Sequence, residues 1–244
     1  RVRAAVLAAG VKWPVGRITI NLAPSGTRKT GSGLDLAMAV GVLVANGDLE
    51  PEPLRDLAFL GELGLDGTVR PVPGIVPLVD ALTSGSVVVP VASAPDAALV
   101  EGPVVRPVAT LGELVGVLRG DMGWVDHPAP AAAPSVTAVL DLADVRGQPV
   151  VRRALEVAAA GAHHLLMVGP PGAGKTMLAS RLPGLLPDLQ REQAMEATRV
   201  HSAAGLNLGG GLLSRPPFRA PHHTATNVAL VGGGTEAMRP GEVS

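Results

Sequence analysis

Residues 169–176 read Gly-Pro-Pro-Gly-Ala-Gly-Lys-Thr and follow a short apolar run, His164-Leu165-Leu166-Met167-Val168. This spacing of glycine, lysine and threonine is that of a phosphate-binding loop, which lies between a buried strand and a helix. The glycines let backbone N–H groups curl around phosphate oxygens at a helix N-terminus, where the helix dipole also favours an anion. The stretch therefore predicts a strand, a loop and a helix, with a phosphate site between them.

The loop carries the side chains that nucleotide chemistry requires. Lys175 would reach the β- and γ-phosphates, and Thr176 would hold Mg²⁺ through its hydroxyl, so the implied cofactors are ATP and Mg²⁺. We expect the whole loop to bind ATP. Its residues are Gly169, Pro170, Pro171, Gly172, Ala173, Gly174, Lys175 and Thr176. The alternative is a glycine-rich turn that binds nothing.

Composition narrows the class of protein. A chain of 244 residues can form two domains with separate cores, and the absence of cysteine excludes disulfides and thiolate metal sites and fits a reducing compartment. Although 47% of the residues are hydrophobic, no run approaches the roughly 18 apolar residues of a membrane span. We expect a soluble chain with no membrane partner.

A Pro/Ala-rich segment divides the chain. Residues 121–137 contain His127-Pro128-Ala129-Pro130-Ala131-Ala132-Ala133-Pro134, which cannot continue a helix and is typical of a linker. Two domains follow from it, residues 1–120 and residues 138–244.

Each domain alternates the two kinds of secondary structure, which indicates an α/β or α+β fold. In the first, we expect strands over 17–22, 86–89 and 104–105, helices over 32–45, 75–82, 96–100 and 111–119, and a hairpin of 57–60 with 68–71 around Asp66-Gly67. In the second, we expect helices over 148–160, after the loop as far as Pro183, and over 191–200, then glycine-rich loop and short strand from 203 onward.

The second domain resembles a known class of ATPase. Residues 141–148, Asp-Leu-Ala-Asp-Val-Arg-Gly-Gln, resemble the segment that opens AAA+ modules and contacts adenine, which makes Val145, Gly147 and Gln148 adenine-side candidates. The loop sequence, Gly-Pro-Pro-Gly-x-Gly-Lys-Thr, is also the form found in AAA+ modules. The strings over 199–205, 215–225, 229–234 and 239–244 resemble magnesium-chelatase-type ATPases.

The first domain resembles the proteolytic domain of Lon proteases through residues 29–36 and 61–74. A Lon-like domain before a chelatase-like AAA+ module is the arrangement of the YifB/ComM family. The resemblance implies an N-terminal Lon-like α+β domain, incomplete at its N-terminus, followed by a P-loop NTPase (AAA+) domain with a parallel sheet, truncated at its C-terminus.

Peptidase chemistry is not expected of the first domain. The Lon Ser–Lys dyad falls on Gly33 and Val76, so both groups are missing, and the neighbouring Ser32 has no lysine partner. The resemblance then implies a scaffold or an oligomerisation module.

The catalytic set of the second domain is also incomplete. No apolar strand ending in Asp-Glu follows Lys175, although hydrolysis requires such an acidic pair for Mg²⁺ and the attacking water. We expect the chain to stop just before that strand, to bind ATP and to hydrolyse it poorly.

The resemblance implies a cytoplasmic ATPase that forms a homo-oligomeric ring, a hexamer in the family, and moves on DNA as a branch-migration helicase. Two alternatives are the ATPase subunit of a magnesium chelatase and a nucleotide-binding scaffold without motor activity. No acidic residue lies between Glu196 and Glu236, so Arg215 and Arg219 are candidates for DNA or intersubunit contacts, with a solvated loop as the alternative.

Overall fold

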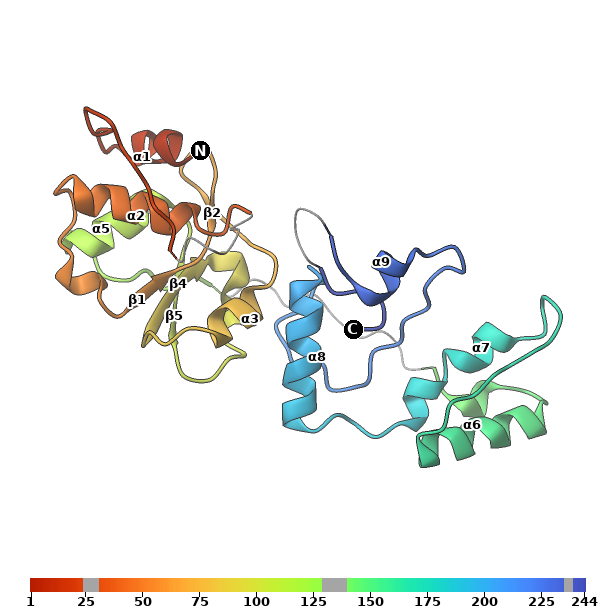
Figure 1. Cartoon of the computed structure of the whole chain (residues 1–244). Coiled ribbons are helices and arrows are strands. Elements are labelled where there is room, and N and C mark those ends of the chain that lie inside the picture. The colour runs from red at the N-terminus through yellow and green to blue at the C-terminus, as the bar shows by residue number, and fades with distance from the viewer. Residues whose placement is uncertain (24–30, 129–139, 235–238) are drawn as a thin grey trace.

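A computed structural model describes residues 1–23, 31–128, 140–234 and 239–244. Residues 129–139, with most of the expected linker, and Lys29-Thr30 lie outside the described residues. In Figure 1 the N-terminal domain lies at the left, helix α8 (Arg191–Ala203) in the middle, and helices α6 (Pro149–Gly161) and α7 (Lys175–Ala179) at the right.

The N-terminal domain is built on a three-stranded parallel sheet. Strands β1 (Leu57–Phe59), β4 (Ser86–Pro90) and β5 (Val104–Val108) pair in the order β1-β4-β5. The valines of β4 are fully buried and alternate between the two apolar clusters of the domain: Val88 packs on one side, Val87 and Val89 on the other. A sheet buried on both faces is what parallel pairing requires.

Helices cover both faces of this sheet. Helices α1 (Val2–Ala8), α2 (Asp35–Ala45) and α5 (Leu111–Arg119) bury Val6, Leu36, Leu43 and Leu114 against Val88. Helices α3 (Ile75–Asp80) and α4 (Ala94–Ala97) bury Val76, Val79 and Ala97 against Val87 and Val89. Short 3-10 turns, η1 (Glu52–Leu54) and η2 (Val91–Ser93), complete the connections. The observed class is mixed α/β.

The expected hairpin forms with a different first arm. Strands β2 (Glu62–Leu63) and β3 (Val69–Arg70) pair antiparallel around the Asp66-Gly67 turn, where Gly67 has φ +84°. Residues Leu57–Phe59, expected in the hairpin, instead pair with β4 in parallel. The apolar character of this segment suits the central sheet better than an exposed hairpin.

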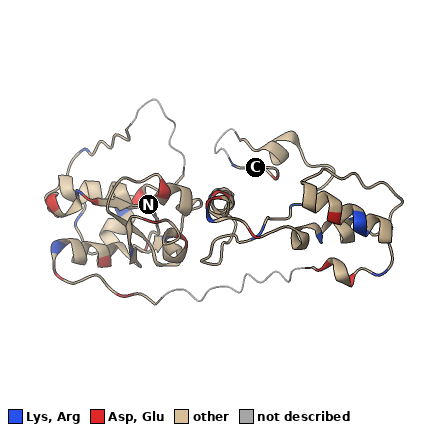
Figure 2. Cartoon of the chain, turned by 90° about the horizontal axis from the view of Figure 1, so that it is seen from below, with Lys and Arg blue, Asp and Glu red and all other residues tan. Residues whose placement is uncertain are grey.

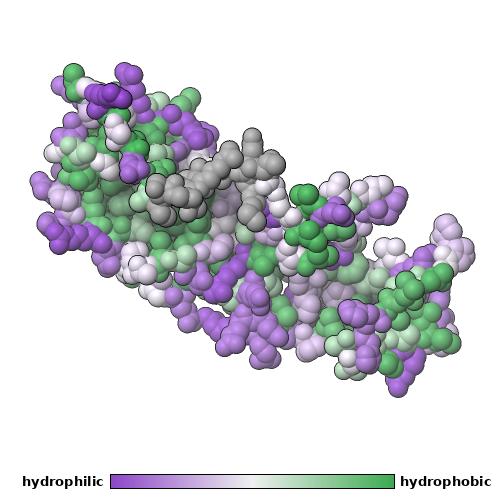
Figure 3. Space-filling view, in the orientation of Figure 1, coloured by the Kyte–Doolittle hydropathy of each residue, from purple (hydrophilic) through white to green (hydrophobic). Residues whose placement is uncertain are grey.

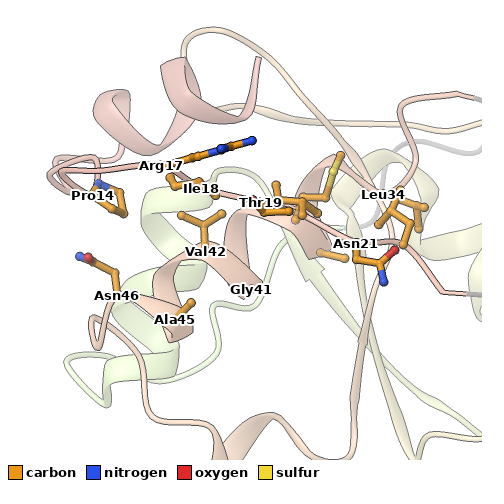
Figure 4. Close-up of a pocket in the computed structure, with 14 residues that line it drawn as sticks. Pro14, Arg17, Ile18, Thr19, Asn21, Leu34, Gly41, Val42, Ala45 and Asn46 are labelled. Carbon is orange, nitrogen blue, oxygen red and sulfur yellow. The ribbon is translucent and has the colours of Figure 1, made fainter.

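The strand expected over residues 17–22 is not formed. These residues lie extended beside α2 and line an open groove of about 560 Å³ with Leu34, Met38 and Val42 (Figure 4). A strand needs a neighbouring strand to pair with as well as alternating side chains. Among the described residues, neither sheet includes this segment.

The phosphate-binding loop belongs to a small helical unit, residues 140–186, which we call the P-loop unit. It contains η3 (Leu142–Asp144), α6, α7 and η4 (Leu182–Leu185), and its core holds Leu142, Val145, Leu155 and Leu178. The sequence predicts a parallel sheet in this half of the chain, but in the described residues the parallel sheet lies in the N-terminal domain alone.

The predicted buried strand before the loop is likewise an exposed extended segment. Met167 packs on the core of the P-loop unit, whereas Leu166 and Val168 are 87% and 88% exposed, and apolar surface is visible over this unit in Figure 3. Because no strand in the described residues pairs with this segment, only the side chains on one side of it are covered.

The remaining elements follow the P-loop unit. Helix α8 packs against α3 of the N-terminal domain, and α9 (Asn227–Val231) is a helix where the sequence predicts loop and strand. None of the helices in the described ranges is both long and apolar enough to cross a bilayer.

Candidate nucleotide-binding site

Two glycines give the loop its curvature. Gly172 and Gly174 have φ of +82° and +80°, a region that other residues adopt at a cost. Gly174 is the N-cap of α7, and its carbonyl accepts the amide of Leu178 at 2.9 Å. The backbone amides of Gly172 and Gly174 donate no hydrogen bond to any residue that the structure describes. Free amides on a curled backbone at a helix N-terminus fit an anion such as phosphate.

Lys175 is held by the loop that it belongs to. Its Nζ donates to the carbonyls of Gly169 and Pro170, both at 2.8 Å. These two hydrogen bonds use N–H groups of the ammonium that could otherwise donate to a phosphate. Binding of a nucleotide therefore competes with the loop for the lysine.

Thr176 is exposed in the first turn of α7, and its carbonyl accepts the amide of Ser180 at 2.9 Å. A hydroxyl at this place suits a magnesium ion bound together with nucleotide phosphates. The loop residues, the lysine and the threonine are thus brought together as the sequence predicts, and they fit a magnesium–nucleotide complex.

The three adenine-side candidates take different places. Val145 is 3% exposed and fills the core beneath the loop. Gly147 and Gln148 both have positive φ, +71° and +55°, and form the turn that leads into α6. The Gln148 side-chain amide donates to the carbonyl of Ala173 at 3.2 Å, so this residue touches the phosphate loop itself. Contact with adenine stays a prediction for all three.

One arginine that the sequence reasoning missed holds the site together. Arg181 donates from Nε to the carbonyl of Asp141 at 3.0 Å and from Nη1 to the carbonyl of Met177 at 2.7 Å. It thereby joins the start of the P-loop unit to the end of α7. A basic residue just after a helix is a usual partner of the last carbonyls, and that position is the signal that could have identified it.

The two arginines proposed for DNA or intersubunit contacts are ion-paired. Arg215 pairs with Asp188 at 3.3 Å and Arg219 with Glu242 at 2.6 Å, and each arginine side chain stays partly exposed. Arg219 also lies near His201, where burial first and then this positive charge lower the pKa of the imidazole. Both effects favour the neutral imidazole of His201.

The sequence of the chain matches known families and proteins. Residues 141–244 match the family model "Magnesium chelatase, subunit ChlI", and residues 1–93 match "Subunit ChlI of Mg-chelatase". The chain is 51% identical over 248 residues to an uncharacterized protein of Mycobacterium tuberculosis. It is 41% identical over 255 residues to competence protein ComM of Haemophilus influenzae and 39% over 246 residues to the uncharacterized protein YifB of Escherichia coli.

Each of these alignments takes in the whole chain but only 49%, 49% and 48% of the respective relative. The chain therefore spans about half the length of the curated relatives that it matches. Two matching family models and relatives named ComM and YifB support the family that the sequence motifs suggested. The chain belongs to the YifB/ComM family of magnesium-chelatase-like AAA+ ATPases.

Proposed function

We propose that this chain supplies the nucleotide-binding half of an ATP-driven motor that acts on DNA. The observation that carries the proposal is the loop of residues 169–176, which presents free amides, a lysine and a threonine at the start of α7. Bound ATP would supply the free energy of phosphoryl transfer to water. The chain's own residues would bind and orient it: the loop amides and Lys175 at the phosphates, and Thr176 at Mg²⁺.

The work on DNA is inferred from the family and from one relative whose printed name is competence protein ComM. Arg215 and Arg219 are the proposed contacts with the phosphate backbone. Each would have to exchange its carboxylate partner for a phosphate, which arginine also binds in bidentate fashion. A homo-oligomeric ring, hexameric as in the family, and a cytoplasmic location belong to the same proposal.

The test is ATP turnover by the full-length protein with and without DNA. We expect DNA to stimulate turnover in the wild type and Lys175→Ala to abolish it. Arg215→Gln with Arg219→Gln should weaken the stimulation, whereas Arg55→Gln, which breaks the exposed pair with Glu52 in the N-terminal domain, should not. Nucleotide binding without any turnover in the wild type would favour an assembly scaffold.

The matched family models favour a second candidate, the ATPase subunit of a magnesium chelatase. In that case the same loop would drive insertion of a metal ion into a tetrapyrrole. Strong stimulation of tetrapyrrole metallation by the full-length protein, without any response of its turnover to DNA, would establish this candidate instead of the DNA motor.

A further inference from the structure

Part of the chain that follows the P-loop unit is bound to the N-terminal domain. This part, which we call the docking segment, comprises α8 and the loop after it, residues 191–213. Leu208 is 4% exposed and belongs to the apolar cluster of α3 and β4, and Met195 packs on the same cluster. The docking segment therefore completes a core that lies mainly in the other domain.

Ser202 forms the polar centre of this contact. Its side chain is buried, its carbonyl accepts the amide of Gly74 at 2.9 Å, and its hydroxyl accepts the amide of Val76 at 3.2 Å. The first amides of a helix have no partner within it, so α8 satisfies the start of α3. Val76 stands where a Lon-like protease would carry its lysine, and here α8 covers its backbone.

Complementary charges surround the buried contact. Arg199 pairs with Asp80 at 2.9 Å, Arg191 pairs with Glu101, and the amide of Gly210 donates to Asp96 at 3.2 Å. The docking segment supplies the positive groups and the N-terminal domain the carboxylates. In Figure 2, α8 is seen nearly along its axis between the N-terminal domain and the P-loop unit, with charged residues on its surface.

The docking segment is also tied to the phosphate loop. In the P-loop unit, Leu182 and Leu185 of η4 pack on the apolar cluster that includes Leu178 of α7. Helix α8 begins a few residues later, and the intervening segment is fixed by the Leu189 amide on the Ser214 carbonyl, 2.8 Å, and by Asp188 on Arg215. Residues 187–190 are therefore the link through which the position of α7 would bear on α8.

In this structure α8 is docked on the N-terminal domain, and Lys175 donates to the loop carbonyls of Gly169 and Pro170. A bound nucleotide would remove Lys175 from those carbonyls, and α7 starts at that residue. We propose that docking of α8 on the N-terminal domain restrains the P-loop unit, so that docking and nucleotide binding oppose each other. The inference rests on the proposed nucleotide site and adds its regulation by the N-terminal domain.

Linkage makes the effect reciprocal: a contact that opposes nucleotide binding is itself weakened by nucleotide to the same extent. The test measures the dissociation constant of a fluorescent ATP analogue in the 244-residue chain. Arg199→Asp should loosen docking and tighten binding by about fivefold or more, and Arg199→Asp with Asp80→Arg should restore the wild-type value. Arg153→Asp, in an exposed pair with Glu156 on α6, is the matched charge control and should change nothing.

The opposite manipulation uses the absence of cysteine. Glu101→Cys with Arg191→Cys, joined by a short bismaleimide, should hold α8 in place and weaken binding of the same analogue, and ATP should slow the joining reaction. Unchanged affinity in both Arg199→Asp and the crosslinked protein would overturn the coupling while leaving the nucleotide site intact. A wild type that binds no analogue would instead refute the nucleotide site on which the coupling rests.

Discussion

Backbone conformation at single glycines decides whether the phosphate loop can form. A Cβ on Gly174 would lie 3.3 Å from Met177 Cε and would force a side chain into φ +80°, whereas a Cβ on Gly169 would meet only Ala173 Cβ at 3.6 Å, an ordinary contact without positive φ. We expect Gly174→Ala to lower the free energy of unfolding by about 1–2 kcal/mol and Gly169→Ala to lower it less. Thermal unfolding without nucleotide measures both, and equal losses would contradict the account.

Burial controls the charge of Asp96 at the docking contact. Burial raises the pKa of this carboxyl above 3.8, and the Gly210 amide offsets only part of the rise. A carboxyl whose pKa is higher in the folded than in the unfolded state stabilises the fold in its protonated form. This contribution is present in full below pH 3.8 and is lost as the pH rises through the pKa of the folded state. Asp96→Asn should therefore raise the melting temperature at pH 7 and give no gain near pH 3.

Asp66 provides a control of opposite sign. Hydrogen bonds from the Thr68 side chain and amide lower the pKa of this carboxyl below 3.8, so its contribution is present above the unfolded pKa and is lost as the pH falls through the folded value. Asp66→Asn should lower the melting temperature at neutral pH. If both Asn variants shifted the melting temperature in the same direction at pH 7, these assignments would be wrong.

At the scale of elements, capping explains why α5 begins where the sequence predicts. Thr110 Oγ1 accepts the amide of Glu113 at 3.1 Å, and Glu113 accepts the amide of Ala109 at 3.0 Å and contacts His127 at 2.6 Å. Thr110→Ala should cost about 1 kcal/mol of unfolding free energy, measured by chemical denaturation. The same change at the exposed Thr19, outside every helix, should cost little, and a neutral Thr110→Ala would contradict the capping role.

Elements with local signals could be predicted, and those with distant partners could not. Apolar spacing identifies α5 and α6 within a residue or two, although Gly161, expected to stop α6, is its last residue. Residues 17–22 and 164–168 have strand-like patterns, yet pairing depends on a second strand that these patterns do not contain. The same holds for the candidate site: the loop is one continuous motif and could be predicted, whereas Arg181 contacts Asp141, a residue far along the chain.

At the scale of the whole molecule, the docking segment and the N-terminal domain share an interface. Leu208 is buried among residues of the N-terminal domain that lie far before it in the chain, so removal of the docking segment should expose part of the N-terminal core. Leu208→Ala should cost about 2–3 kcal/mol of unfolding free energy, measured by denaturant unfolding monitored through the two tryptophans. The exposed Leu65, 66% accessible, offers the matched control, and equal effects of the two changes would argue against the interface.

The central claim is that residues 169–176 bind a magnesium–nucleotide complex. Isothermal titration of the 244-residue chain with ATP and Mg²⁺ tests it most directly, with Lys175→Ala measured in parallel. We predict saturable binding at one site per chain in the wild type and its loss in the variant, since the ammonium group that leaves the carbonyls of Gly169 and Pro170 for the phosphates is then missing. No heat of binding in the wild type, or equal affinity in the variant, would contradict the account.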